Sequence, residues 1–465
     1  MILPRDAQSI IDTLKKAGFE AYAVGGSVRD TIMGKPTKGW DYTTNATPEE
    51  ILALFPDSFY DNQFGTVGVK IYESPSARPI PGIKKIDSGN LTVSDIYEIT
   101  TYRSEKGYAD RRHPDTVRWG VTIEEDLARR DFTINAIAWD GKRLIDPYGG
   151  QKDITATIIR AVGDPKERFA EDALRMMRAV RLAAELGFSI DESTLAGIQA
   201  NAHLLVNISM ERVRDELLRI LAAQFASDAI LVLKATGLLT IILPEFDEAF
   251  ATPQKSPKRH HIYDVGTHSV MAMKYCPSAD PVVKLATLLH DIGKPKTFHK
   301  DETGLITFYN HEVAGTRMVR KIVERLRLSK KQSDLVLTLV RWHQFSVDER
   351  QTDAAIRRFI RRVGKENLDA MLALRIGDRL GGGAQETSWR LELYKKRLVE
   401  VQKQPFTVHD LLVNGHDVMA ELGVKPGPII GTLLDQLFAE VEAGTLVNER
   451  EALLTRMREL KSTIN

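Results

Sequence analysis

The sequence predicts a multidomain α+β protein, in which a small α/β head with a mixed sheet precedes predominantly helical regions. Short strand-like and helix-like segments alternate near the start of the chain, as in a small α/β unit. Beyond about residue 164, long amphipathic helical patterns replace them. The chain has 465 residues, more than one ordinary core organises.

The head is expected to contain two helices and at least four strands. Helical spacing of apolar residues predicts helices at Ala7–Lys16 and Pro48–Leu54. Strand-like runs occur at Ala21–Val24, Thr66–Tyr72, Ile96–Thr101 and Ala136–Trp139. Between the second and third of these, the Pro-, Gly- and Ser-rich segment Ser74–Gly89 is expected to form a surface loop.

Four regions follow from these patterns. We expect a head at residues 1–160, a helical neck at 161–250, a third domain at 251–400 and a helical tail at 401–465. The neck helices are predicted at Glu171–Leu186 and Met210–Leu221. Breaker-rich stretches at Thr252–His261 and Lys403–Pro405 mark the last two boundaries.

Composition limits the classes of function. Lys and Arg total 64 against 63 Asp and Glu, so the net charge of +1 gives no global attraction to nucleic acid, and an RNA-binding surface has to be local. Cys276 is the only cysteine, which excludes an internal disulfide framework. The sequence lacks a signal-peptide pattern and an uncharged apolar run of about 18 residues. We therefore expect a soluble, cytoplasmic protein.

A glycine pair after the first strand is the first candidate site. Gly25, Gly26 and Ser27 stand between the strand and a helix start, where backbone amides can converge on a phosphate. Arg29 can add a forked cationic donor, and Asp30 can orient the turn. Without further context, a plain tight turn explains the glycine pair better than a phosphate site does, and a surface ion pair is the alternative for Arg29 and Asp30.

A carboxylate follows at Asp41. Two-metal phosphoryl transfer uses carboxylates at strand positions i and i+2, because these side chains share a face and can hold Mg²⁺. The combination of GGSVRD at Gly25–Asp30 with Trp40-Asp41-Tyr42-Thr43-Thr44 resembles class II tRNA nucleotidyltransferases, the family of CCA-adding enzymes and bacterial poly(A) polymerases. In that family two Asp residues of a D-x-D motif bind the metals. Here the second matches Asp41, and Gly39 occupies the first position.

The resemblance extends through the rest of the head. It implies a third acidic ligand at Glu98, although an exposed strand glutamate is an equally good interpretation. The segment from Tyr102 to Pro114 resembles the family's flexible loop, which is associated with moving from C addition to A addition. Asp126–Ala136 nearly copies the RRDFTINA motif, so Arg130 is expected to contact the nucleotide. By chemistry alone, its charges are as consistent with a capping salt-bridge network.

The neck carries the family's EDxxR motif on what the pattern predicts as one continuous helix from Arg168 to Arg181. There, Asp172 and Arg175 would be neighbours on one face, either as a surface ion pair or as donors and acceptors for a base. The resemblance implies that this pair selects C and A without a template. It also places Arg178 and Arg181 near the nucleotide, and it matches Ile208–Leu217 to a structural helix.

A second constellation lies in the third domain. Adjacent imidazole and carboxylate ligands occur in Leu288–Pro295, and other histidines and an aspartate surround them in the chain, a set suited to a divalent transition metal. The order H…HD…D resembles the HD phosphohydrolase superfamily, which implies water attack on a phosphomonoester or cyclic phosphodiester. The expected ligands are His268, His290, Asp291 and Asp378, with His311 and His343 as two additional candidates.

The last motifs concern RNA. Leu411–Asp417 and Leu422–Gly431 resemble a C-terminal segment of the same family. Basic clusters at Arg317–Lys331 and Arg357–Arg362 are able to meet tRNA phosphates, but a solvated helix face explains each cluster better by itself.

The sequence thus predicts Mg²⁺-dependent, template-independent addition of CCA from CTP and ATP to the 3′ end of tRNA, with HD-type phosphohydrolase activity as a second module. Two alternatives remain: an A-adding enzyme or poly(A) polymerase, and a tRNA-binding phosphohydrolase whose polymerase head is impaired by Gly39.

Overall fold

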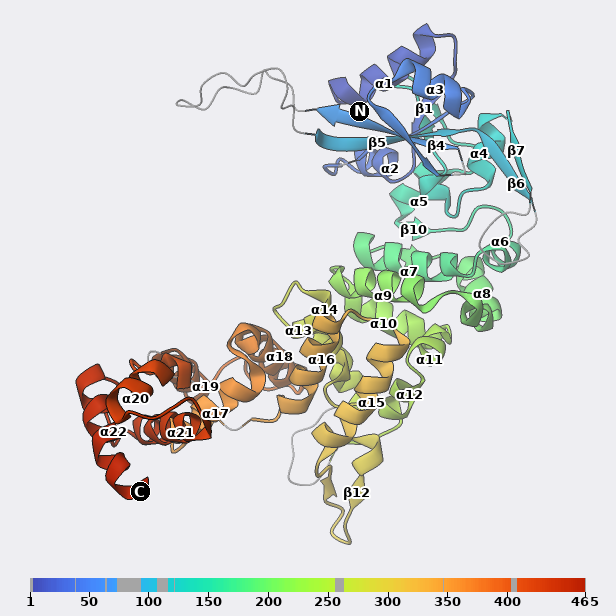
Figure 1. Ribbon diagram of the computed structural model, residues 1–465. Helices are drawn as coiled ribbons and strands as arrows, with labels where there is room; N and C mark the ends of the chain where they lie inside the picture. The colour runs from blue at the N-terminus through green and yellow to red at the C-terminus, as the bar shows by residue number, and fades with distance from the viewer. Residues whose placement is uncertain are drawn as a thin grey trace. The chain divides into compact units, whose positions relative to one another are not determined.

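A computed structural model describes residues 3–37, 39–62, 65–72, 93–106, 116–120, 122–255, 263–345, 347–402 and 408–464. The chain divides into two compact units, Met1–Pro244 and Glu245–Asn465. The first contains a mixed sheet and the second is almost entirely helical, which confirms the predicted α+β class (Figure 1).

The head is built on a seven-stranded sheet of order β3-β4-β5-β2-β1-β8-β9. The strand β2 (Asp41–Thr44) pairs antiparallel with β1 (Ala21–Val24) and parallel with β5 (Val93–Thr101), so the sheet is mixed. The remaining members are β3 (Ser58–Asn62), β4 (Thr66–Tyr72), β8 (Ala138–Trp139) and β9 (Leu144–Ile145). A separate hairpin pairs β6 (Arg103–Lys106) with β7 (Thr116–Trp119).

Short helices flank this sheet. In Figure 1, α1 (Arg5–Lys16) and α3 (Pro48–Leu54) lie over one face, and α2 (Gly26–Ile32) lies on the other. The apolar stripe of α1 is buried, and Tyr42 of β2 donates a hydrogen bond to the Ala7 carbonyl at 3.0 Å. The face of β2 opposite Tyr42 therefore remains for the site. The head also contains α4 (Ile123–Ala128), η1 (Thr133–Asn135) and α5 (Gly150–Ala156).

The neck differs from the expected continuous helix. A first helix, α6 (Pro165–Glu171), ends before Asp172, whose φ of −138° and ψ of 105° are extended, and α7 (Leu174–Leu186) begins two residues later. The prediction was wrong here because the Asp172 carboxylate accepts from the Leu174 backbone N–H at 3.0 Å, which favours a cap over a helix interior. Asp172 and Arg175 are therefore not neighbours on one helix face.

The other helices of the first unit form the body of the neck. They are α8 (Glu192–Asn201), η2 (Ala202–Asn207), α9 (Met210–Ala222), α10 (Ala226–Ala235) and α11 (Leu238–Ile242). A two-stranded parallel pair is formed by β10 (Ile158–Ile159) and β11 (Ser189–Ile190). The helix α9 packs on α7, as the amphipathic pattern from Met210 predicts.

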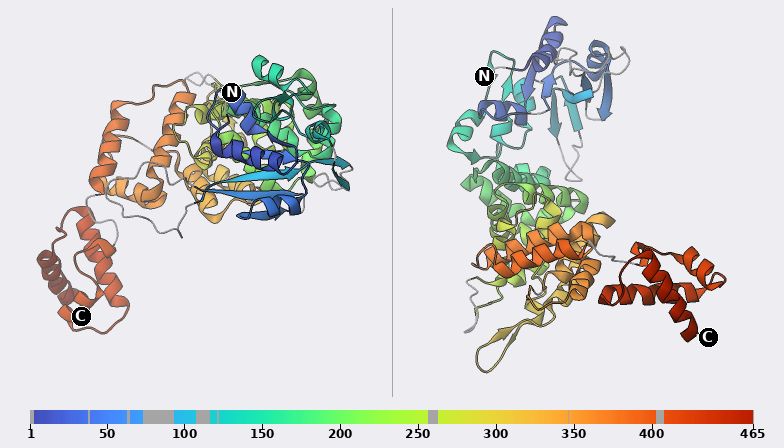
Figure 2. Two further views of the ribbon diagram at one scale, coloured as in Figure 1. Left: turned by 90° about the horizontal axis from the view of Figure 1, so that it is seen from above. Right: turned by 90° about the vertical axis from the view of Figure 1, so that its left-hand side faces the viewer.

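The helix α12 (Pro244–Phe250) starts at the last residue of the first unit, and the second unit is dominated by helices (Figure 2). Its helices before the tail are α13 (Val265–Tyr275), α14 (Pro281–Leu289), α15 (His311–Arg325), α16 (Lys330–Trp342), α17 (Asp353–Val363), α18 (Leu368–Gly381) and α19 (Trp389–Val401), with η3 (Pro295–Thr297), η4 (Lys365–Asn367) and the hairpin β12 (His299–Lys300) and β13 (Ile306–Thr307).

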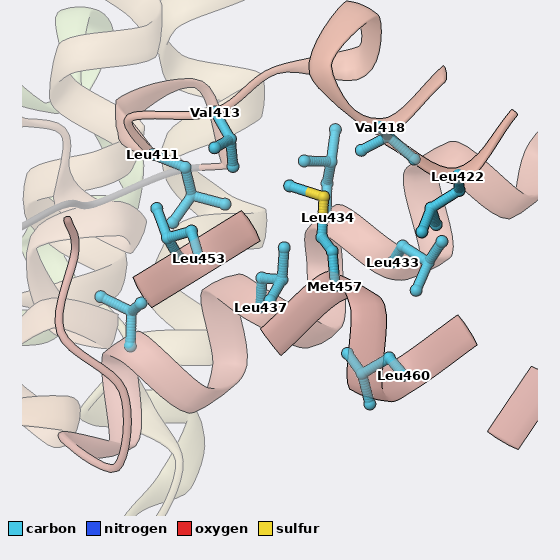
Figure 3. Close-up of a cluster of buried hydrophobic side chains, with 11 residues drawn as sticks. Leu411, Val413, Val418, Leu422, Leu433, Leu434, Leu437, Leu453, Met457 and Leu460 are labelled. Atoms are coloured by element: carbon cyan, nitrogen blue, oxygen red, sulfur yellow. The ribbon is translucent and has the colours of Figure 1, made fainter. Parts of the chain in front are cut away.

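The tail forms its own apolar cluster from η5 (Val408–Asp410), α20 (Gly415–Leu422), α21 (Pro428–Ala443) and α22 (Arg450–Ile464). Figure 3 shows side chains from all three helices meeting, with Leu437 and Met457 among them. Burying one such side chain stabilises the fold by about 1.5–3 kcal/mol.

Several predicted segments lie outside the described residues: the surface loop at 74–89, residues 107–115 of the flexible loop, and most of both predicted boundaries near 256–262 and 403–407. Within the described part of the chain, no helix combines the length and hydropathy required to cross a bilayer.

Candidate active sites

The glycine turn, Asp41 and Arg130 converge in the head. Gly25 has a φ of 78°, which favours glycine, and a methyl group at this residue would lie 3.4 Å from Asp41 Oδ2 and 3.5 Å from Arg130 Nη1. Three motifs that are far apart in the sequence thus meet at one place. Arg130 Nε is buried and finds no acceptor among the described residues, so a donor is available for an anionic ligand.

Asp41 and Glu98 occupy adjacent strands. In the parallel β2–β5 ladder Asp41 is registered against Glu98, so both carboxylates project from the same face of the sheet. Both side chains are exposed. Such a pair of carboxylates supplies the oxygen ligands that Mg²⁺ prefers.

Gly39 lies outside this ladder. Its φ is 67°, in the left-handed region, and β2 begins only at Asp41. Its backbone N–H donates to Asp95 Oδ2 at 3.0 Å. The residue at the expected first metal position therefore sits in a bend, and it contributes no carboxylate.

The electrostatics of Asp41 are those of a partly desolvated carboxylate. Although the side chain reaches solvent, loss of hydration raises the pKa of Asp41, and the Arg130 guanidinium opposes this rise. A divalent cation at this position would stabilise the charged form.

Arg29 is held by the RRDFTINA motif. Its Nη1 donates to Asn135 Oδ1 at 2.8 Å, and its Nε donates to Asp30 Oδ1 at 2.9 Å. Ser27 Oγ donates to the Val24 carbonyl at 3.1 Å. The Arg29–Asp30 pair expected as an alternative is thus present, but Arg29 is buried and is also anchored to a second motif. The Asn135 contact had no signal in the spacing alone.

The motif around Arg130 is organised by Asp126. This fully buried carboxylate accepts from Thr43 Oγ1 of β2 at 3.2 Å and from Arg129 Nη2 at 2.8 Å, and it lies 3.6 Å from Arg130 Nη2. Although burial raises the pKa of Asp126, the two arginines hold it below its ordinary value. Asp126 thus ties the Asp41 strand to Arg130, so the predicted salt-bridge network and the convergence on Asp41 coexist.

The neck contacts the same motif through Arg178. Its Nη2 lies 2.9 Å from Asp131 Oδ2. Burial raises the pKa of Asp131, but Arg178 and Arg175 outweigh it and hold the carboxyl below its usual range. Arg178 therefore couples α7 to the segment that carries Arg130.

Asp172 and Arg175 have different partners from those expected. Arg212 of α9 lies with its Nη2 3.1 Å from Asp172 Oδ2, and Arg175 Nη1 pairs with Glu171 and donates to the Arg168 carbonyl at 3.1 Å. Both side chains are largely buried. The Ile208–Leu217 motif, predicted as a structural helix, thus also positions Asp172.

Arg181 is engaged by two carboxylates. Its Nε donates to Glu216 of α9 at 2.7 Å and its Nη1 donates to Glu185 at 2.8 Å. Burial lowers the pKa of Arg181, but these acids more than compensate and raise it. In this structure the guanidinium joins α7 to α9.

In the second unit, the six predicted ligands form two groups of three, and the Asp291 carboxylate of one group lies close to the other. His268, His290 and Asp378 lie within 4.8 Å of one another, as do Asp291, His311 and His343. The Asp291 oxygens face both groups: Oδ2 is 3.2 Å from His290 Nε2 and Oδ1 is 3.2 Å from His311 Nε2. The structure therefore brings the whole predicted set together, including the two additional histidines.

Glycines allow the helices that carry these ligands to approach closely. A methyl group at Gly377 would lie 2.4 Å from the Ala272 carbonyl oxygen, so α18, with Asp378, packs directly on α13, with His268. A methyl group at Gly293 would lie 2.1 Å from the His311 carbonyl oxygen. This contact brings the start of α15 to the Asp291 turn.

Backbone carbonyls set the orientation of three rings. The Nδ1 atoms of His290, His311 and His343 lie 2.7, 2.8 and 2.7 Å from the carbonyl oxygens of Thr287, Phe308 and Val340. A proton on Nδ1 leaves Nε2 as the free lone pair, and all three Nε2 atoms face the cluster. His290 Nε2 is buried and lies 3.2 Å from Asp291 Oδ2. The donor set therefore fits divalent transition metals.

The carboxylates of the cluster interact with protonated or cationic side chains around them. Burial lowers the pKa of His290, but Asp291 and Asp378 outweigh it and raise the pKa to about 10. Despite burial, neighbouring histidines hold the pKa of Asp378 well below its usual range. Lys294 Nζ lies 2.5 Å from Asp291 Oδ2, and it donates to Gln254 Oε1 at 2.6 Å. The spacing of Lys294, three residues after Asp291, is compatible with this contact, whereas nothing in the sequence indicates the contact with Gln254.

Comparison with known proteins agrees with this arrangement. Residues 21–160 match the poly A polymerase head domain, 187–250 match a region described as a probable RNA and SrmB-binding site of polymerase A, and 298–457 match tRNA nucleotidyltransferase domain 2. The fold and these matches thus define a nucleotidyltransferase with a poly(A) polymerase head domain.

Full-length relatives are more specific. The CCA-adding enzyme of Ligilactobacillus salivarius is 31% identical over 458 residues, covering 98% of this chain and 96% of the relative. That of Levilactobacillus brevis is 34% identical over 454 residues, covering 96% of both. The crystal structure of the Bacillus stearothermophilus CCA-adding enzyme in complex with CTP matches with a TM-score of 0.68 and 29% identity, covering 99% of this chain and 98% of that one. This chain belongs to the CCA-adding enzyme family.

Proposed function

We propose that this chain adds CMP, CMP and AMP, from CTP and ATP, to the 3′ end of tRNA without a nucleic-acid template, in the cytoplasm. The observation that carries the proposal is the convergence of Gly25, Asp41 and Arg130, with Glu98 on the adjacent strand. Full-length similarity to CCA-adding enzymes supports the same reaction.

In this proposal the head binds the triphosphate. The first turn of α2 leaves backbone N–H groups at Gly26 and Ser27 without helical acceptors, and Arg130 offers its unpaired Nε to phosphate oxygens. Asn135 holds Arg29 beside the turn, where the guanidinium stabilises the negative charge of the triphosphate. Asp41 and Glu98 would hold Mg²⁺, which supplies positive charge to the phosphates and to the attacking 3′ hydroxyl.

The neck selects the base. Arg212 and the Leu174 N–H orient the Asp172 carboxylate, which can accept from the exocyclic amino group that C and A share. Arg175 donates to ring nitrogen or carbonyl groups, after exchanging a contact with Glu171 or the Arg168 carbonyl. Arg178 links this region to Asp131, and Arg181 holds α7 on α9. The roles follow the expected division into a head at 1–160 and a neck at 161–250.

A direct test uses tRNA that lacks CCA, with each labelled nucleotide supplied separately and then together. We expect CMP incorporation with CTP alone and AMP incorporation only after CMP has been added. An A-adding enzyme or poly(A) polymerase would instead add AMP alone. No incorporation, with tRNA binding retained, would favour the alternative in which Gly39 impairs the head.

A second candidate function is metal-dependent phosphohydrolysis at the residues around Asp291. Six ligands in two groups, five of them buried, with the Asp291 carboxylate facing both groups, favour it. These residues would hold divalent transition metals, and the metals would supply activated water for hydrolysis of a phosphomonoester or cyclic phosphodiester. The expected third domain, 251–400, would contain this centre.

Metal analysis tests this second function independently of addition. We expect about two metal ions per chain, and at least one lost in Asp291→Ala. His299→Ala serves as the control, because this exposed histidine lies in β12 outside the two groups. Equal metal content in both variants would exclude the centre.

A further inference from the structure

The two basic clusters that the sequence contains have different structural fates. In α17, Arg357 is buried and its Nη2 donates to the Glu442 carbonyl, and Arg361 lies 2.9 Å from the Glu442 carboxylate. Arg362 stacks on Trp342. Arg357 and Arg361 thus join α17 to α21, and Arg358 is exposed, so this cluster offers fewer uncommitted cations to a partner than the other one.

The other cluster points outward. The segment 317–331 contains seven cations and one carboxylate, whereas the whole chain carries a net charge of +1, so the rest of the chain is net negative. The buried face of α15 is formed by His311, Gly315, Val319, Ile322 and Val323. The exposed cations are Arg317, Arg320, Lys321, Arg327, Lys330 and Lys331, which we call the α15–α16 basic patch.

Most of this charge has no intramolecular neutralisation. Within the described part of the chain, Arg317, Arg320, Lys330 and Lys331 form no ion pair or side-chain hydrogen bond. Lys321 acts electrostatically on Glu245, whose carboxylate is already held by Arg325 at 2.7 Å. The exposed acids on these two helices near the patch are Glu324 and Asp334. The patch therefore retains a strong positive potential.

Several cations of the patch occupy positions that are unfavourable for the local stability of α15 and α16. Arg327 follows α15 with a φ of 54°, a position where helices favour glycine. Lys330 and Lys331 occupy the first turn of α16, where the helix dipole favours anions and the structure has none. On α15, Arg317 and Lys321 are like charges at i and i+4.

The N-terminal capping box of α16 lacks the carboxylate that other capping boxes of this chain contain. The capping boxes of α3, α4 and α20 close with Glu50, Glu125 and Asp417, whereas that of α16 closes with neutral Gln332. Local rules that fail together at one surface indicate a function for that surface.

We propose that the α15–α16 basic patch is a docking surface for the phosphodiester backbone of the tRNA substrate. Six exposed cations on two consecutive helices and the segment between them match a repeating anion, and contacts with phosphates contribute affinity without sequence selection. The inference rests on the proposed function for the identity of the RNA. It assigns a new binding surface outside the head and neck.

The test compares two triple variants of equal charge in the full-length protein. One is Lys321→Gln, Lys330→Gln and Lys331→Gln. The control is Lys274→Gln, Lys300→Gln and Lys396→Gln, three exposed lysines of the same unit outside the patch. Anisotropy of labelled tRNA without CCA is measured over a salt series. For the patch variant we expect Kd to rise at least about tenfold and the slope of log Kd against log salt to fall by about 2, relative to the control.

Equal Kd and slope for the two triple variants would overturn the patch while leaving the proposed function intact. Failure of the unsubstituted protein to bind tRNA would instead contradict the proposed function. Polyglutamate that displaces tRNA as well as unlabelled tRNA does, at equal charge, would overturn RNA as the partner.

A single variant separates binding from folding. Arg327→Gly places the favoured residue at the left-handed position, so we expect Tm to stay equal or rise while Kd for tRNA increases about two- to fivefold. A fall in Tm with unchanged Kd would show that Arg327 serves the fold and would remove it from the patch.

Discussion

Asp41 on β2 and Glu98 on β5 are registered neighbours in the one parallel strand pair described for the head sheet, with Gly25 and Arg130 beside Asp41. Because residues in register on parallel strands project from the same face, two carboxylates reach the place where the glycine turn can hold a phosphate. This relationship underlies the predictions for the head.

Asp41→Asn should lower nucleotide incorporation at least about 100-fold, since an amide cannot replace a charged metal ligand. Glu98→Gln should have a smaller effect of about tenfold or more. Asp95→Asn is the matched control on the same strand, because its carboxylate contacts the Gly39 N–H. Single-turnover addition of labelled CTP measures all three. Full activity of Asp41→Asn would remove Asp41 from the catalytic site.

Gly39→Asp should raise incorporation, because it returns a carboxylate next to Asp41. The left-handed φ of 67° costs a non-glycine residue about 1 kcal/mol of unfolding free energy. A side chain there meets no described atom within 4 Å. Gly39→Asn has a similar backbone cost but no charge, and it is the control. If Asp and Asn variants incorporate nucleotides at the same rate, the missing carboxylate has no importance.

Arg212→Met should relax base selection in the same direction as Asp172→Ala, because Arg212 holds the Asp172 carboxylate at 3.1 Å. We expect UMP and GMP incorporation to rise relative to CMP and AMP, by up to about tenfold. Arg214→Gln on the same helix is the control, since Arg214 pairs with its neighbour Asp215. Competition assays with mixed nucleotides report the ratio. Unaltered selectivity in both Asp172→Ala and Arg212→Met would exclude templating by this pair.

Arg178→Gln should make the first unit more sensitive to acid. The folded pKa of Asp131 is depressed, so its contribution to stability is present above the unfolded pKa of about 3.9 and is lost as pH falls through the lower folded value. Without Arg178 the folded pKa rises, and stability at neutral pH falls by about 1 kcal/mol. Arg219→Gln is the control, because Arg219 forms an exposed ion pair with Glu185 in the same unit. Acid unfolding followed by circular dichroism should show a higher midpoint pH only for Arg178→Gln.

Much of the head could be predicted because its signals are local. Strands at Ala21–Val24 and Thr66–Tyr72, and the helix at Pro48–Leu54, have the predicted bounds, since alternation, helical spacing and a Thr47 cap agree there. The proximity of Asp41 to Glu98 could not be derived from spacing, because strand order depends on long-range pairing.

The neck shows what a periodic pattern cannot detect. The apolar spacing continues through Asp172, but a side-chain cap on the Leu174 N–H and the Arg212 contact outweigh the helix there. Likewise, the two basic clusters look similar in sequence, but in the structure Glu442 engages Arg357 and Arg361 of the second cluster. In both regions, contacts with residues distant in the sequence determine the structure.

The central claim is tested most directly by incorporation of labelled CTP and ATP into tRNA that lacks CCA, with the unsubstituted protein and its Gly39→Asp variant side by side. We predict CMP followed by AMP at the tRNA 3′ end, with the same product order and a higher rate in the variant. Addition of AMP alone, or no addition by either protein despite tRNA binding, would contradict the assignment of CCA-adding activity to this chain.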